Sequence, residues 1–143
     1  MAQTNVLVVE DESIVSKDIQ QSLKKLGYHV VGAASTGEQA VQLATEHLPD
    51  IILMDIMLKG EMNGIEAATQ IRAETNIPVI FLTAYADEST LSKAKVTQPY
   101  GYIIKPFKEI DIHTSIEMAL YKHKKEAEVL KERDLLCSLV EGQ

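Results

Sequence analysis

Five short apolar segments divide the chain, and each is followed by a longer segment in which apolar residues recur at every third or fourth position. The apolar segments cover residues 6–9, 29–34, 51–54, 79–82 and 100–104. Uninterrupted apolar runs of this length are typical of strands that are buried on both faces of a parallel sheet. The alternation therefore predicts an α/β fold with a doubly wound, five-stranded parallel sheet in the order 2-1-3-4-5.

Capping residues and apolar anchors indicate where the intervening helices lie. Ser13 is suited to the N-cap of the first helix. Thr36 and Gln39 have the spacing of a capping box, which predicts a second helix that buries Leu48 near its end. Residues 87–96 also have a helical pattern but few apolar anchors, so we expect the loosest helix there.

The last helical segment is much longer than the others. It begins near Glu109 and contains neither proline nor glycine until Gly142, well beyond the ordinary length of a globular helix. Ile110, Ile116 and Leu120 are the apolar residues of this segment that we expect to pack on the sheet. The sequence becomes strongly polar after position 121, so we expect a domain at 4–122 and a helical extension at 123–143.

Two apolar patterns in this extension favour a contact with another helix. The first is a seam with 4-3-4-3 spacing, made of Ile116, Leu120, His123, Ala127 and Leu130. The second is a group of aliphatic residues with nothing left in the chain to cover them: Leu135, Leu136, Leu139 and Val140. A solvated, charge-paired helix end would also account for this composition. We favour a signalling helix that pairs with a second copy or continues into a further domain.

Composition restricts the class of protein. The chain has 143 residues, 45% of them hydrophobic, which is enough for one domain with a core. A net charge of −7 argues against direct nucleic-acid binding, which needs clustered Lys and Arg. No apolar run approaches the roughly 20 residues of a membrane span. Cys137 is the single cysteine, which suits a reducing compartment. These features predict a soluble, cytoplasmic domain.

Polar residues that can do chemistry follow four of the predicted strands. Glu10 and Asp11 follow the first strand, Asp55 the third, Thr83 the fourth and Lys105 the fifth. Right-handed crossovers bring all of these strand ends to one edge of the sheet, where open α/β sheets place their ligands. Three carboxylates so close together repel one another and need a cation to stay ionised. Oxygen ligands without Cys or His favour Mg²⁺.

This set of residues has the parts that phosphoryl transfer needs. Asp55 can act as the nucleophile, and Mg²⁺ with Lys105 can neutralise the charge of the transferring group. Thr83 can donate its hydroxyl hydrogen to a phosphoryl oxygen. Each residue alone has an ordinary explanation at a strand end, and their joint occurrence at successive strand ends is what favours a common site.

The same residues, with their order and spacing, resemble a known family. The family is the receiver domain of two-component response regulators, which has a flavodoxin-like fold, and the resemblance covers roughly residues 4–122. The residues that carry it are Glu10-Asp11, Asp55, Thr83-Ala84, Tyr102 and Lys105-Pro106.

The resemblance implies a role for each residue of the site. Asp55 would accept phosphate from the phosphohistidine of a histidine kinase or a phosphotransfer protein. Asp11 would bind Mg²⁺ (or Mn²⁺) directly, Glu10 would bind it through water, and the Met57 carbonyl would complete the protein ligands. Thr83 and Tyr102 would report phosphorylation to the surface of helix 4, strand 5 and helix 5, which is also a candidate homodimer face alongside the C-terminal helix. Such a protein is a signalling phosphoacceptor, with no catalysis beyond its own phosphorylation and dephosphorylation.

Two departures and two other functions stay open at this point. The first acidic position is Glu10 where the family more often has Asp, and Leu58 stands where the family often has proline. A Mg²⁺-dependent phosphohydrolase would need an Asp-x-Asp motif after the first strand, and the sequence there is Glu-Asp-Glu. A receiver-like module that acts without phosphorylation is the other alternative, and the complete set of reacting groups speaks against it.

Overall fold

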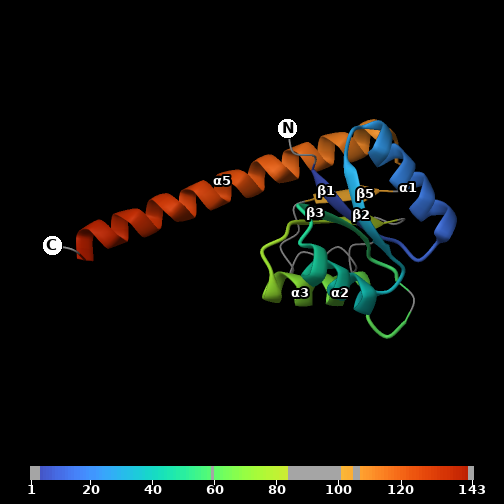
Figure 1. Ribbon diagram of the computed structural model, residues 1–143, viewed down its shortest axis with the longest axis horizontal. Helices are drawn as coiled ribbons and strands as arrows, with labels where there is room; N and C mark the ends of the chain where they lie inside the picture. The colour runs from blue at the N-terminus through green and yellow to red at the C-terminus, as the bar shows by residue number, and fades with distance from the viewer. Residues whose placement is uncertain (1–3, 59, 84–100, 105–106, 142–143) are drawn as a thin grey trace.

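The fold is a single parallel sheet between two layers of helices (Figure 1). The computed structural model describes residues 4–58, 60–83, 101–104 and 107–141, with side chains as far as residue 129. The strand order β2-β1-β3-β4-β5 confirms the predicted doubly wound topology. The strands are β1 (Asn5–Val9), β2 (His29–Ala34), β3 (Ile51–Asp55), β4 (Val79–Thr83) and β5 (Gly101–Ile104).

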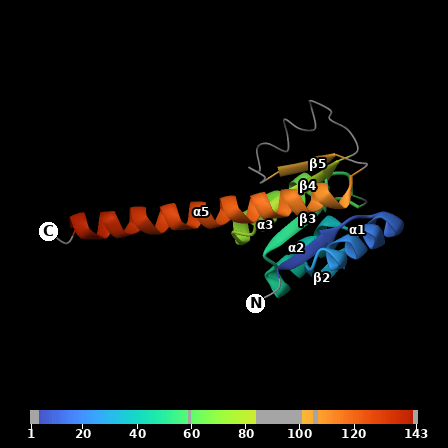
Figure 2. The same ribbon diagram turned by 90° about the horizontal axis from the view of Figure 1, so that it is seen from above.

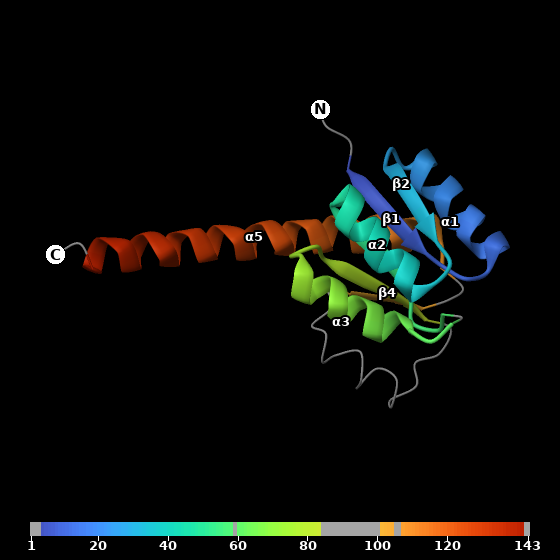
Figure 3. The same ribbon diagram turned by 60° about the horizontal axis from the view of Figure 1, so that its bottom comes forward.

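Helices cover both faces of the sheet, as Figure 3 shows. Helices α1 and α5 lie on one face, and helices α2 and α3 lie on the other. Their bounds are α1 (Ser13–Lys25), α2 (Gly37–His47), α3 (Gly64–Glu74) and α5 (Glu109–Glu141). The predicted helix at 87–96 lies outside the described residues.

The burial of the strands explains their uninterrupted apolar sequences. Val6 and Val8 pack into the core under α1 and α5, whereas Leu7 and Val9 pack into the core under α2 and α3. Every residue of β3 and β4 is buried, including the terminal Asp55 and Thr83. Because both faces are covered, successive side chains all enter a core and no polar alternation is needed.

Two local predictions about α1 and α2 are wrong, and a third holds only in part. Helix α1 begins at Ser13, so the N-cap is Glu12, which makes no capping hydrogen bond with its side chain. Thr36 does cap α2, but the side-chain oxygen of Gln39 accepts the backbone N–H of Ser35, whereas a capping box would have it accept the N–H of Thr36. Leu48 is 63% exposed, because it adopts the left-handed conformation that ends α2 and turns its side chain away from the core.

Helix α5 packs on the sheet with only its first half and then leaves the domain (Figures 1 and 2). At about 1.5 Å per residue its 33 residues extend roughly 50 Å. Among the residues of α5 up to position 129, the buried ones are Ile112, Ile116 and Ala119, at intervals of four and three. The predicted packing of Ile110 is wrong: Ile110 is exposed, because it lies on a different face of the helix from Ile116.

Polar contacts fix the packed half of α5 to the domain. The hydroxyl of the buried Tyr28 donates to Glu117 at 2.6 Å and lies 3.0 Å from Nδ1 of His113. Burial, followed by the hydrogen bond to Glu117 and its charge, raises the pKa of Tyr28. Farther along the helix, Nε2 of His123 donates to the carbonyl oxygen of Asn76 at 2.7 Å. The seam predicted through Ile116 and His123 is therefore occupied by the domain itself in this part of α5. Within the described residues, no helix combines the length and apolar content that a membrane crossing requires.

Candidate functional site

Strand β3 carries Asp55 to the carboxyl edge of the sheet. The side chain is only 5% exposed, although it is the last residue of the strand. The backbone N–H of Met57 donates to Oδ1 of Asp55 at 2.9 Å, and the N–H of Ile56 donates to the Leu82 carbonyl at 3.1 Å. These contacts orient the carboxylate, so a buried acid is held in a fixed position at the end of the central strand.

Two further carboxylates meet Asp55 at this edge. Glu10, Asp11 and Asp55 each offer a carboxylate oxygen, and these oxygens lie within 4.8 Å of one another. Glu10 is 2% exposed, and its Oε1 accepts the backbone N–H of Glu12 at 3.2 Å. Asp11 is half-buried. Three anionic groups at this spacing repel one another in the absence of a cation, and an all-oxygen set fits Mg²⁺.

The loop that follows Asp55 is fixed by the start of α3. Asn63 is the N-cap of α3, and it exchanges hydrogen bonds with Glu66 in a complete capping box. Gly64 donates its N–H to the Ile56 carbonyl at 2.9 Å, and a Cβ at this position would overlap the Asp55 carbonyl. Sequence reasoning missed this role of Gly64, although the Asn-Gly-x-Glu pattern was a signal for the capping box.

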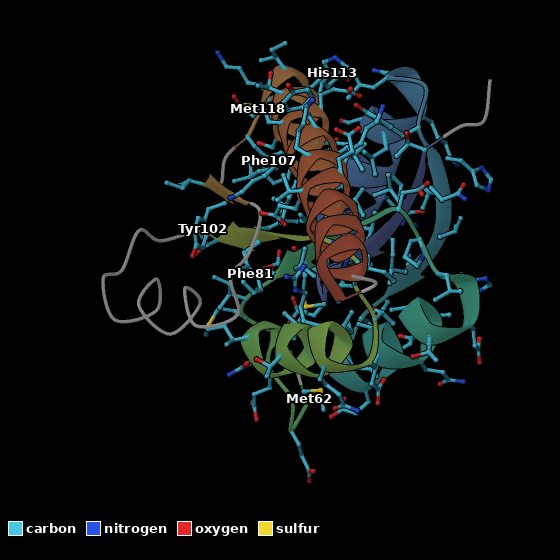
Figure 4. The ribbon with its side chains drawn as sticks, turned by 90° about the vertical axis from the view of Figure 1, so that its left-hand side faces the viewer. Met62, Phe81, Tyr102, Phe107, His113 and Met118 are labelled. Carbon is cyan, nitrogen blue, oxygen red and sulfur yellow. The ribbon has the colours of Figure 1, made fainter. Side chains whose placement is uncertain are left out.

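Thr83 and Tyr102 lie on the neighbouring strands β4 and β5, and β4 is next to the strand that carries Asp55. Thr83 is buried at the end of β4, the strand next to β3. Tyr102 pairs with Phe81 across β4 and β5, and the two rings lie 6.2 Å apart at 29° (Figure 4). The hydroxyl of Tyr102 is buried and has no hydrogen-bond partner among the described residues, and burial raises the pKa of this tyrosine.

For two residues of the predicted site, Lys105 and Met57, the proposed contacts stay predictions. Lys105, together with Pro106, lies outside the described residues, so its place relative to Asp55 stays a prediction. Met57 is described, and its side chain is exposed while its backbone N–H binds Asp55. The role of its carbonyl oxygen as a metal ligand also stays a prediction.

Together, the fold and the site define a class of protein. It is a doubly wound α/β domain with an acidic cluster at the switch point, where the strand order reverses. Comparison with protein families goes further: the family model described as the response regulator receiver domain matches residues 6–117. The chain therefore belongs to the response regulator receiver domains. Receiver domains are signalling proteins rather than enzymes, they typically bind Mg²⁺ at an acidic pocket, and they interact with kinases or phosphotransfer proteins.

Individual relatives agree with this assignment. The chain is 35% identical over 115 residues to the transcriptional regulatory protein PdtaR of Mycobacterium tuberculosis, a match that covers 80% of this chain and 56% of PdtaR. It superposes on the receiver domain of a modulated diguanylate cyclase from Desulfovibrio desulfuricans with a TM-score of 0.83 and 42% identity, over 87% of this chain and 99% of that one.

A third match extends along α5. It is a chain in which a trimeric coiled-coil segment of yeast Spc42 is fused to another protein. The TM-score is 0.84 at 33% identity, and the match covers 98% of this chain and 97% of that one. Among the curated relatives, the chain spans about half of the length of PdtaR and of similar regulators.

Proposed function

We propose that this chain is a phosphoacceptor in which Asp55 takes a phosphoryl group from the phosphohistidine of a histidine kinase or phosphotransfer protein. The observation that carries the proposal is the meeting of Glu10, Asp11 and Asp55 within 4.8 Å at the carboxyl edge of the sheet. In this proposal Asp11 and Asp55 bind Mg²⁺ directly, Glu10 binds it through water, and the Met57 carbonyl completes the protein ligands. Membership of the receiver family supports these roles.

In the proposed transfer, a carboxylate oxygen of Asp55 attacks the phosphorus atom of the phosphohistidine. A P–O bond forms and the P–N bond breaks, so the electron pair stays on the imidazole nitrogen, which then takes a proton from water. The product on this chain is an acyl phosphate. Mg²⁺, when bound, supplies positive charge that offsets the charge of the phosphoryl oxygens. The Met57 N–H holds the carboxylate in place for the attack.

The experiment that tests this function uses acetyl phosphate as a small donor. The wild-type chain is incubated with acetyl phosphate and Mg²⁺, and its intact mass is measured with time. We expect a single added phosphoryl group, and no addition when the metal is removed with a chelator. An unmodified mass at saturating Mg²⁺ would instead favour a receiver-like module that works without phosphorylation.

Thr83 and Tyr102 are proposed to relay the phosphorylated state. A phosphoryl group on Asp55 would offer an acceptor oxygen to the hydroxyl of Thr83, and movement of Thr83 would open space for Tyr102. Among the described residues the buried hydroxyl of Tyr102 has no partner, which supports this relay, because a buried polar group without a partner gains from a rearrangement that provides one. The surface that receives the signal would include β5 and the first half of α5.

Thr83→Ala is expected to separate phosphorylation from the relay. The variant keeps the three carboxylates and should still take up phosphate, but without the hydroxyl the phosphorylated and unphosphorylated forms should exchange backbone amide hydrogens alike. Hydrogen exchange followed by mass spectrometry checks this, with wild type as the reference. A difference between the two forms that survives in the variant would mean that the signal takes another route.

We also propose that α5 pairs with a second copy of this chain. Between positions 118 and 129, three exposed apolar side chains share the face of the helix opposite the residues packed on the sheet: Met118, Tyr121 and Val129. At 100° per residue they fall within an arc of roughly 80°. Lys125 lies over the Tyr121 ring at 5.6 Å and pairs with Glu128 at 3.5 Å on the same side. The match over 98% of this chain with a chain that carries a trimeric coiled-coil segment supports helix–helix contact along α5, and pairing with one further copy is the form of that contact we propose.

Val129→Glu is the substitution that tests the pairing. Val129 is 54% exposed, so the change leaves the core intact but places a charge in the proposed contact. We expect a dimer mass for wild type by light scattering and a monomer mass for the variant. Lys124→Gln changes the net charge by the same amount at another face of α5 and should keep the dimer. A monomer mass for wild type across the concentration range would refute the pairing.

A further inference from the structure

The start of α2 lies against the loop that follows Asp55. Gly37 is the first residue of α2 and is buried. A Cβ built on Gly37 would lie 2.9 Å from Cγ, 2.9 Å from the carbonyl oxygen and 3.0 Å from Cβ of Met62. Met62 packs against the core between the sheet and the two helices, and Figure 4 shows it beside α3. The two segments therefore touch at a distance that only glycine permits.

Met62, one partner of this contact, is connected to Asp55 through the two residues that follow it. Met62 precedes Asn63, whose capping box fixes the first turn of α3. The next residue, Gly64, donates its N–H to Ile56 and lies directly against the backbone of Asp55. A displacement of Met62 is therefore passed to Asp55 through two residues that are themselves held by hydrogen bonds and close backbone contact.

Gly37, the other partner of the contact, is connected to Glu10 through the end of β2. Gly37 follows the N-cap Thr36, and Ala34 at the end of β2 accepts the backbone N–H of Glu10 at 3.0 Å. Glu10 and Asp55 come from different strands, and their carboxylates are among the three that approach within 4.8 Å. The contact between Gly37 and Met62 thus joins the two segments that carry these acids.

We infer that Gly37 and Met62 are positioning residues for the proposed metal and phosphorylation site. The direct pairing of Val9 with Met54 fixes the strands that carry Glu10 and Asp55. The contact between Gly37 and Met62 holds the loop after Asp55 against the end of β2, so it adjusts the affinity of the acidic cluster for Mg²⁺. Neither residue touches the reacting atoms. The inference rests on the proposed function, since the cluster must bind a divalent cation for its spacing to matter.

Gly37→Ala is expected to weaken Mg²⁺ binding by about tenfold, the low end of what supporting residues around metal sites contribute. The side chain of Met62 can move away from a new methyl group, but its backbone carbonyl cannot move without shifting the loop. Phosphorylation by acetyl phosphate should slow at low Mg²⁺ and return close to the wild-type rate at saturating Mg²⁺. A merely structural role would lower the melting temperature without this dependence on metal concentration.

A double-mutant cycle with Met62→Ala tests whether the contact itself is responsible. Mg²⁺ affinity is measured by calorimetry for wild type, both single variants and the pair. Truncation of Met62 removes the Cγ contact but keeps the backbone carbonyl and the Cβ that a methyl group at position 37 would meet, so the pair should bind Mg²⁺ as weakly as Gly37→Ala alone. Gly101→Ala is the matched control, because no atom of the described residues lies within 4 Å of a Cβ at that glycine, and its Mg²⁺ affinity should equal that of wild type.

Two results would overturn the inference: an unchanged Mg²⁺ affinity in Gly37→Ala, or the wild-type affinity in the pair, which would leave no role for the backbone of the loop. If Gly37→Ala does not fold, Met62→Ala alone removes the side-chain part of the same contact and should weaken Mg²⁺ binding in its place. Failure of the proposed function is distinguishable, because it would show as a wild-type chain that takes up no phosphate at any Mg²⁺ concentration.

Discussion

Asp55→Asn is expected to take up no phosphate from acetyl phosphate, even at saturating Mg²⁺. The amide has nearly the shape of the carboxylate, so the backbone N–H of Met57 keeps an oxygen to bind and the fold should be retained. An amide is not a nucleophile toward phosphorus under these conditions, so the acceptor is lost while the rest of the site stays in place. Intact mass spectrometry measures the uptake, and thermal unfolding confirms that the variant is folded.

Asp18→Asn provides the control for this loss. Asp18 is exposed on α1, and its substitution makes the same chemical change away from the acidic cluster. The control should be phosphorylated at the wild-type rate. Phosphate uptake by Asp55→Asn at a similar rate would move the acceptor to another residue.

Asp11→Asn is expected to have two effects of opposite sign. Without metal, the variant should be more stable than wild type by about 0.5–1 kcal/mol, because one of three mutually repelling carboxylates has been neutralised at a half-buried position. With Mg²⁺, the variant should lose most of the stabilisation that the ion gives wild type, since a ligand that binds the folded state stabilises it by mass action. Thermal unfolding over a range of Mg²⁺ concentrations measures both effects.

The sign of the first effect distinguishes a cation site from an ordinary cluster of surface acids. If Asp11 served the fold, for example by capping α1, its substitution would destabilise the metal-free protein. A lower stability of Asp11→Asn without metal, together with an unchanged response to Mg²⁺, would contradict the proposed role. Glu12→Gln is a useful comparison, because Glu12 is the exposed neighbour of Asp11 and the actual N-cap of α1.

The sheet and the acidic cluster could be predicted from sequence because each depends on a simple rule. Strands such as β3 enter a core on both faces, so their side chains are all apolar and the run is easy to recognise. Once the strands are parallel with right-handed crossovers, their carboxyl ends must share one edge. The approach of Glu10, Asp11 and Asp55 follows from that topology without knowledge of any side-chain conformation.

The face of α5 that packs on the sheet was harder to predict, although the spacing of the apolar residues contained part of the information. Ile110 and Ile116 are six residues apart, which places them on different faces of a helix, whereas Ile112, Ile116 and Ala119 follow the helical interval. A comparison of the two phases would have chosen Ile112 as the buried residue. The bond between His123 and Asn76 could not be predicted, because it depends on where α5 passes the end of the sheet.

Close backbone approaches were the other features that sequence could not reveal. Gly37 and Gly64 look like ordinary residues at the start of helices, a position that many residue types can occupy. Their importance comes from atoms that are far away in the sequence, the carbonyl of Met62 and the carbonyl of Asp55. Local propensity contains no information about such distances, which only the packed arrangement of α2, α3 and β3 determines.

The most direct test of the central claim is to locate the phosphoryl group on the chain. Wild-type protein is labelled with acetyl phosphate and Mg²⁺, then reduced with borohydride, which converts an aspartyl phosphate into homoserine, and digested for peptide sequencing by mass spectrometry. The account predicts homoserine at position 55 and an unchanged aspartate at position 11. Homoserine at another position, or a phosphoryl group that survives reduction on a serine or threonine, would contradict it.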